Sequence, residues 1–128
     1  MKIVIILDCS LIVVSLMIQD DIIVFGSTIH LLCTLDNSLD LTKSSARLWF
    51  GGSENKVLSF NGFSSDPNKY VENAISTRQF RLKIFNTSKA DVNCYYKCVC
   101  DFKFDEKMLD LNTTKYQCKY KLNSFNII

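Results

Sequence analysis

Apolar and polar residues alternate along several short segments of the chain, which is the period of a β-strand with one buried face. The clearest segment carries four apolar side chains spaced two apart: Ile29, Leu31, Cys33 and Leu35. Leu82 and Ile84 repeat the pattern, and turn signals such as Asn61-Gly62 separate the shorter apolar runs. Short strands with closely spaced turn signals predict an all-β fold, a two-sheet β-sandwich.

The first 15 residues have the features of a secretion signal. Lys2 precedes an apolar run, and Val13 and Ser15 have the small-residue spacing of a cleavage site. Asp8 interrupts the run, and the alternative interpretation is a membrane anchor or a buried strand; the run is too short to span a bilayer. The expected division has three parts: a signal peptide (1–15), a single domain (16–123) and a C-terminal stub (124–128).

Size, charge and cysteine count disfavour several classes of partner and predict the compartment of the protein. The chain has 128 residues, enough for one domain, and a net charge of +2, too small to favour nucleic acid as a partner. Six cysteines indicate an oxidising compartment, so we expect a secreted or extracellular protein. We find no phosphate-binding loop and no paired-carboxylate motif, and expect neither a cofactor nor a small-molecule substrate.

The segment after Cys100 predicts a hairpin, with a turn in the charged run Asp105-Glu106-Lys107. A turn centred on Glu106 sets three facing pairs: Cys94 with Cys118, Tyr96 with Tyr116, and Phe104 with Met108. Opposed cysteines and opposed tyrosines favour this register.

The stretch from Leu82 to Cys98 resembles the corner between the fifth and sixth conserved strands of an immunoglobulin variable-type domain. Asp91 stands where that family has its corner aspartate, and Tyr95 or Tyr96 stands where it has its corner tyrosine. One residue too many lies between Asp91 and Cys98, which predicts a bulge there. The resemblance implies a variable-type sandwich, and the long stretch before Leu82 agrees with the extra strands of that type.

The immunoglobulin resemblance implies two structural features and leaves one question open. It implies a disulfide between Cys33 and Cys98 that joins the two sheets, with Trp49 packed against it. Arg47 stands where the family has an apolar inward residue, so the register of that strand stays open.

A narrower resemblance is to the amino-terminal domain of the OX-2 glycoprotein family. It rests on Cys94 directly before Tyr95, on Cys118 in the predicted last strand, and on the glycosylation sequon at Asn86. This family implies a ligand of an inhibitory receptor on myeloid cells, and a Cys94–Cys118 disulfide. A Cys100–Cys118 disulfide is the competing connectivity. The compact form would suit a viral copy, poxviral or herpesviral.

Other functions remain to be weighed against this one. A truncated variable-type domain would serve as a generic adhesion or decoy module. A zinc protein would use four cysteines, Cys94, Cys98, Cys100 and Cys118, but their spacing is not that of paired Cys-x-x-Cys units, and we expect no metal site. An enzyme is not expected, because a thiol nucleophile needs a nearby base and His30, the only histidine, is predicted on another strand.

The predicted receptor site is the outer face of the sheet that carries Trp49 and Cys98. If Cys98 points inward, its neighbours point outward, and Phe102 and Phe104 near the hairpin are candidate anchors unless they pack beneath it. The candidate receptor-binding residues are Lys97, Val99, Phe102, Phe104, Lys115 and Lys119. Sequons at Asn86 and Asn112 predict exposed glycosylation sites.

Overall fold

The computed structural model describes residues 12–110 of the chain, which form β-strands and one short 3-10 helix, η2 (Lys89–Asp91). The strands are β1 (Val14–Ile18), β2 (Ile29–Leu35), β3 (Arg47–Gly51), β4 (Lys56–Phe60), β5 (Phe63–Ser64), β6 (Tyr70–Ser76), β7 (Gln79–Ile84), β8 (Cys94–Cys100) and β9 (Lys103–Leu109).

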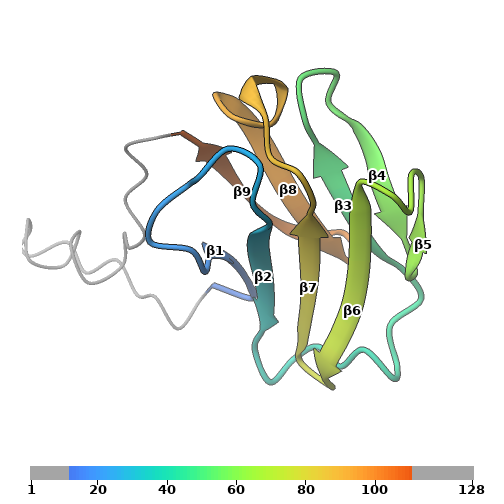
Figure 1. The fold of residues 1–128 in the computed structure, drawn as a ribbon. Helices are drawn as coiled ribbons and strands as arrows, with labels where there is room; N and C mark the ends of the chain where they lie inside the picture. The colour runs from blue at the N-terminus through green and yellow to red at the C-terminus, as the bar shows by residue number, and fades with distance from the viewer. Residues whose placement is uncertain (1–11, 111–128) are drawn as a thin grey trace, which may run out of the picture.

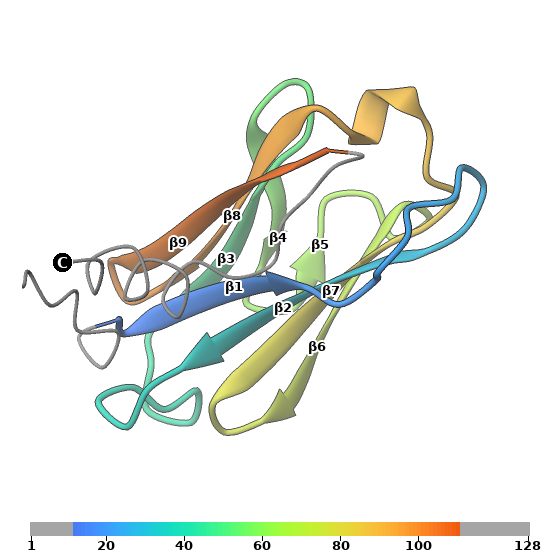
Figure 2. The ribbon, with the colours of Figure 1, turned by 90° about the vertical axis from the view of Figure 1, so that its left-hand side faces the viewer.

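The strands make two antiparallel sheets that pack face to face (Figures 1 and 2). The four-stranded sheet has the order β1-β2-β7-β6, and the five-stranded sheet has the order β5-β4-β3-β8-β9. This is the variable-type arrangement, with β4 and β5 as the added strands, and it confirms the predicted fold class. β4 pairs with β3 on one side and with β5 on the other, so it is not an edge strand.

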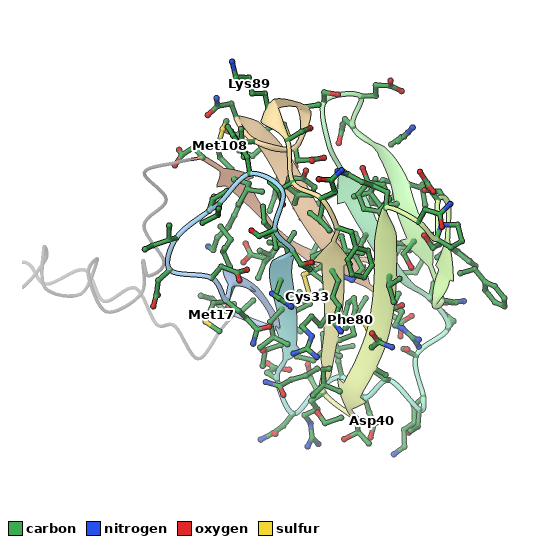
Figure 3. All side chains as sticks on the ribbon, viewed as in Figure 1. Met17, Cys33, Asp40, Phe80, Lys89 and Met108 are labelled. Carbon is green, nitrogen blue, oxygen red and sulfur yellow. A yellow bond between two sulfur atoms is a disulfide. The ribbon has the colours of Figure 1, made fainter. Side chains whose placement is uncertain are left out.

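The core lies between the sheets and is built from the inward residues of the alternating strands. Cys33 and Cys98 form the expected disulfide. Trp49 is fully buried opposite Cys98 on the neighbouring strand, and its ring meets the edge of Phe80 with centroids 5.6 Å apart. Cys33 and Phe80 lie between the two sheets, whereas Lys89 and Asp40 mark opposite ends of the sandwich (Figure 3).

The corner tyrosine is Tyr96, not Tyr95. Its buried hydroxyl donates to the carbonyl oxygen of Asp91 at 2.8 Å, and burial raises the pKa of Tyr96 well above its ordinary value. Tyr95 is 51% exposed. The extra residue makes no bulge, because β8 pairs without a register shift on both sides. The turn before β8 accommodates it instead, with Asn93 in the left-handed conformation (φ 57°) that asparagine tolerates.

Asp91 is held by a network at the start of η2. Its Oδ2 accepts from the Ser88 backbone N–H, while the Ser88 side chain accepts from the N–H of Ala90. The Lys69 ammonium lies 2.7 Å from the same Oδ2, and the carboxylate is 6% exposed. A buried carboxylate is costly unless it is paired and hydrogen-bonded, and Asp91 has both kinds of partner.

The predicted hairpin register is wrong. β8 and β9 are joined by the two residues Asp101 and Phe102, and Glu106 lies within β9 opposite Lys97. Cys94 therefore faces Leu109 rather than Cys118, Tyr96 faces Lys107 rather than Tyr116, and Phe104 faces Val99 rather than Met108. The charged run that indicated a turn lies within β9, the last strand of this sheet among the described residues, where Oδ2 of Asp105 accepts the backbone N–H of Leu16 on β1 at 2.7 Å.

Several predicted features lie outside the described residues. They are Asn112, Lys115, Cys118, Lys119 and the stub (124–128). The residues that pair with β8 on this side are Lys103–Leu109, all within the described chain. The Cys94–Cys118 disulfide loses the support of the predicted register and now rests on the family resemblance alone.

β1 contains the expected end of the signal peptide. The predicted cut after Ser15 would remove Val14 from the core, where its side chain is 4% exposed and pairs with Leu35. Leu16 to Ile18, which follow the predicted cut, form the rest of this strand. The division at residue 15 stays a prediction. Within residues 12–110, no helix has the length and apolarity needed to cross a membrane.

Arg47 points inward even though it is charged. Its Nε lies 3.0 Å from Oε2 of Glu72, a residue of the other sheet whose side chain is 1% exposed. This ion pair explains how a charge occupies a position that is apolar in related domains, and it answers the open question of register on β3.

Candidate binding face

The outer face of the five-stranded sheet carries a continuous line of apolar side chains. Strand registers place one residue from each strand side by side, and we call this set the apolar row: Phe63 (β5), Phe60 (β4), Leu48 (β3), Val99 (β8) and Phe104 (β9). Phe63, Phe60 and Phe104 are 80%, 48% and 60% exposed. Isolated exposed apolar residues need no explanation, but a row that crosses a whole sheet forms a patch of the kind that marks interaction sites.

The alternation of the strands explains the row. On β4, Leu58 is buried, so Val57 and Phe60 face outward across a register shift between β3 and β4. On β8, Cys98 points to the core, so Lys97 and Val99 point away from it. A soluble sandwich usually places polar residues on such outward positions.

The other sheet follows the usual rule and provides an internal comparison. Its two central strands direct mainly polar side chains outward: His30, Thr34, Gln79, Arg81 and Lys83. His30 belongs to this outer face, and its Nδ1 lies 3.2 Å from Oδ1 of Asp20. Within the described residues, the central strands of the two outer faces therefore differ in chemistry: mainly polar on the four-stranded sheet and mainly apolar on the five-stranded sheet.

Lys97 interrupts the apolar surface next to the row. Its ammonium lies 5.0 Å from the ring centre of Phe50 and 5.2 Å from that of Phe104. Both contacts are cation–π interactions, which favour a lysine head group held over the rings. Glu106 faces Lys97 on β9, but among the described residues no carboxylate lies within ion-pair distance of the Lys97 ammonium.

The tip of the β8–β9 hairpin is rigidly anchored. Oδ1 of Asp101 accepts from the backbone N–H groups of Ser45 and Ala46 and from the Ser45 hydroxyl, and the Asp101 N–H donates to the carbonyl of Ala46. Desolvation opposes ionisation, but these hydrogen bonds outweigh it and lower the pKa of Asp101 below 3.8. The anchor fixes the position of the next residue, Phe102.

Phe102 is the most exposed large apolar residue of the described chain, at 95%. Its φ is 74°, a left-handed conformation that is unfavourable for a bulky side chain. Strained backbone of this kind concentrates at functional sites, so the tip is a candidate contact point. The alternative in which Phe102 and Phe104 pack beneath the hairpin is wrong, because both side chains project into solvent.

The structure thus brings together four of the predicted receptor-binding residues, which are Lys97, Val99, Phe102 and Phe104. Sequence reasoning missed their neighbours on β3, β4 and β5, namely Leu48, Phe50, Val57, Phe60 and Phe63. Alternation around Leu58 predicts an outward Val57 but an inward Phe60, and the register shift between β3 and β4 turns Phe60 outward. Phe63 follows the Asn61-Gly62 turn and becomes part of the face only once the pairing of β4 with β5 is known.

The cysteines do not form the zinc site considered as an alternative. Cys98 is in the disulfide with Cys33, so the set of four thiolates is wrong. Burial raises the pKa of the Cys94 thiol and that of the Cys100 thiol, and a raised pKa leaves little of the nucleophilic thiolate. In residues 12–110 no group of His, Cys, Asp or Glu is arranged to hold a metal ion.

The sequon at Asn86 lies in the turn that precedes η2. Asn86 is exposed and has a φ of 48°, whereas Thr87 is buried and donates its hydroxyl to the carbonyl of Ser27. The acceptor side chain thus stands in solvent beside an anchored backbone. Glycosylation at Asn86 stays a prediction, and this geometry is compatible with it.

Known structures share this architecture. A complex of Dpr2 Ig1-Ig2 with DIP-Theta Ig1-Ig3 contains a chain with a TM-score of 0.56 and 15% identity, over 74% of this chain and 32% of that one. A complex of Dpr11 IG1 with DIP-gamma IG+IG2 gives 0.54 and 21%, over 68% and 43%. The chain has an immunoglobulin fold. The Dpr1 IG1–DIP-eta IG1 complex matches with 0.54 and 14%, over 75% of this chain and 94% of that one.

These comparisons establish the immunoglobulin fold and do not establish a family or a function. No family model matches the sequence, and no curated protein matches it. The domain spans less than half the length of the first two structural neighbours, and all identities quoted are too low to transfer a function. The neighbours above point neither to the OX-2 family nor to a viral origin, so both stay predictions.

Proposed function

We propose that this protein is an extracellular binding module that recognises another immunoglobulin-type domain through the outer face of its five-stranded sheet. The observation that carries the proposal is the apolar row, since the outward residues on the central strands of the other sheet are mainly polar. Aromatic residues in the middle of a contact surface are the usual anchors of binding energy. The neighbouring structures are complexes of one immunoglobulin domain bound to another, which supports a partner of that kind.

The narrower proposal is a ligand of an inhibitory receptor on myeloid cells. It rests on the OX-2 resemblance, namely the Cys94-Tyr95 pair and the sequon at Asn86, and on the use of the matching sheet face by that family. A secreted single domain of this kind would act as a mimic that damps myeloid activation, and a viral origin would suit that role. A generic adhesion or decoy module would bind by the same face without signalling.

The test is a binding screen with the secreted domain. Multimeric wild-type protein is applied to a panel of immunoglobulin-type receptor ectodomains that includes inhibitory myeloid receptors. A variant with Leu48→Asp places a charge in the apolar row and should abolish binding to any receptor that the wild type binds. Lys83→Glu, on the outer face of the other sheet, is the control and should bind normally.

Two results would count against the proposal. One is a panel without any binder. The other is a receptor that tolerates Leu48→Asp but loses binding to Lys83→Glu, since that would place the contact on the opposite sheet. A reporter for inhibitory signalling in cells that carry the bound receptor separates the mimic from the adhesion module.

A further inference from the structure

Lys97 is the single cation within the apolar part of the binding face in the described chain. On the outer surface it has Tyr95 and Val99 along its own strand, Phe50 on β3 and Phe104 diagonally on β9. Phe50 and Phe104 hold its ammonium between their rings. A lysine stem can cover apolar surface, but its head group normally stays in water.

A partner that covers the apolar row must also cover Lys97. Removing a charge from water is unfavourable unless an opposite charge or hydrogen bonds replace the water. Among the described residues, Glu106 lies opposite Lys97 on β9, yet its side chain is exposed and makes no ion pair with Lys97. The compensating group must therefore come from the partner.

A second copy of the same chain does not supply that group. Two copies related by a twofold axis through the middle of the face would bring their Lys97 residues toward each other. Like charges brought together in a desolvated interface repel each other and disfavour the complex. The face is therefore better suited to a different domain than to self-association.

Resting on the proposed function, we propose that Lys97 determines which partner the face accepts. The partner is a different immunoglobulin-type domain whose contact face is apolar around one carboxylate, and this carboxylate meets the ammonium of Lys97. Phe50 and Phe104 act as positioning residues, because their rings fix the ammonium where the carboxylate must be. The apolar row supplies contact area, and Lys97 supplies selectivity.

The experiment compares Lys97 variants on the receptor panel, with receptor ectodomains as probes. Lys97→Glu should weaken binding by about 30-fold or more, which is the lower end of the effect of disrupting a buried charge pair. Lys97→Met keeps the apolar stem and should weaken binding by about tenfold, since the partner carboxylate is left unpaired. Lys97→Arg keeps the charge and stacks on aromatic rings, so its affinity should stay close to that of the wild type.

Lys83→Glu is the matched control, a charge reversal on the opposite sheet that should leave affinity unchanged. Replacing the contacting carboxylate of the bound receptor with lysine should restore binding to Lys97→Glu. Sedimentation of the wild-type domain should show a monomer, and melting curves should show that all variants are folded.

Three results would overturn the inference. A receptor that is lost with Leu48→Asp but binds Lys97→Glu normally leaves the proposed function standing and removes the role of Lys97. A wild-type dimer that dissociates with Leu48→Asp makes the face a self-association surface. A panel without any binder removes the proposed function itself, and this inference with it.

Discussion

Arg47 on one sheet and Glu72 on the other are joined by an ion pair of 3.0 Å near the edge of the sandwich. The Glu72 side chain is 1% exposed, whereas that of Arg47 is 23% exposed, so the carboxylate depends on its partner more than the guanidinium does. Removing one member of a buried pair leaves the other charge uncompensated, and replacing both with apolar residues is often neutral or stabilising.

We therefore expect Arg47→Leu to lower the free energy of unfolding by about 3 kcal/mol, since it strands the buried Glu72 carboxylate. Glu72→Leu should cost less, because water can reach Arg47. The double variant Arg47→Leu, Glu72→Leu should be at least as stable as the better single variant. Urea denaturation measures all three, and a double variant less stable than both singles would contradict the explanation.

The hydroxyl of Tyr96 donates to the carbonyl of Asp91, whereas the Tyr95 residue is half exposed. Tyr96→Phe removes the donor and leaves the Asp91 carbonyl without it, so we expect a loss of about 1–2 kcal/mol in the free energy of unfolding. Tyr95→Phe is the matched control and should change stability by less than about 0.5 kcal/mol. Equal effects in thermal melts would mean that the corner hydrogen bond adds no stability.

Phe102 should improve binding at the expense of stability. Its φ of 74° suits glycine, which is the preferred second residue of a two-residue hairpin turn. Phe102→Gly should therefore raise the free energy of unfolding by about 1 kcal/mol. The same variant should weaken binding to a receptor found in the screen, because it removes an exposed aromatic side chain. Phe102→Ala separates the effects, since it loses the ring without gaining the freedom of glycine.

The Asp101 carboxylate should contribute stability that is lost at acidic pH. Its folded pKa lies below the ordinary 3.8 because the hydrogen bonds from Ala46 and Ser45 outweigh desolvation. A depressed folded pKa contributes stability that is fully present above pH 3.8 and lost as the pH falls through the folded pKa. Asp101→Asn should show a smaller loss of stability between pH 5 and pH 2 than the wild type, measured by melting temperature. A parallel pH dependence in the two proteins would show that this carboxylate does not contribute.

The predicted Cys94–Cys118 disulfide can be decided by peptide mapping under non-reducing conditions. Cys94 is only half-buried, whereas Cys100 is fully buried and points between the sheets, so Cys94 is the more accessible partner. We expect a Cys94–Cys118 peptide next to the Cys33–Cys98 peptide. Recovery of Cys100 joined to Cys118 would contradict the OX-2 pattern at this position.

The strands that carry the core could be predicted, because period-two alternation and the tryptophan and cysteine positions are local features. The β8–β9 hairpin could not. Its turn, Asp101-Phe102, contains no glycine, and it is stabilised by hydrogen bonds to Ser45 and Ala46, residues that are distant in sequence. The charged run at Glu106 gave the stronger local turn signal and was misleading.

The binding face was predictable only in part, for a related reason. Lys97 and Val99 follow from the inward direction of one cysteine on the same strand. Phe60 and Phe63 join the face through strand pairing, and pairing depends on long-range register that a single sequence does not specify. The choice between Tyr95 and Tyr96 likewise depended on how the turn at Asn93 absorbs one residue.

β5, the strand at one end of the five-stranded sheet, is only two residues long. An unpaired edge is a template on which another extended chain can add itself, and natural sheets limit this by keeping edge strands short. At this end of the sheet, β5 offers too few backbone groups to extend the ladder, while Phe63 still projects from it. A partner domain that binds at this end is therefore expected to contact the outward side chains rather than to add a strand to the sheet. For the same reason, this edge does not support fibre growth by strand addition.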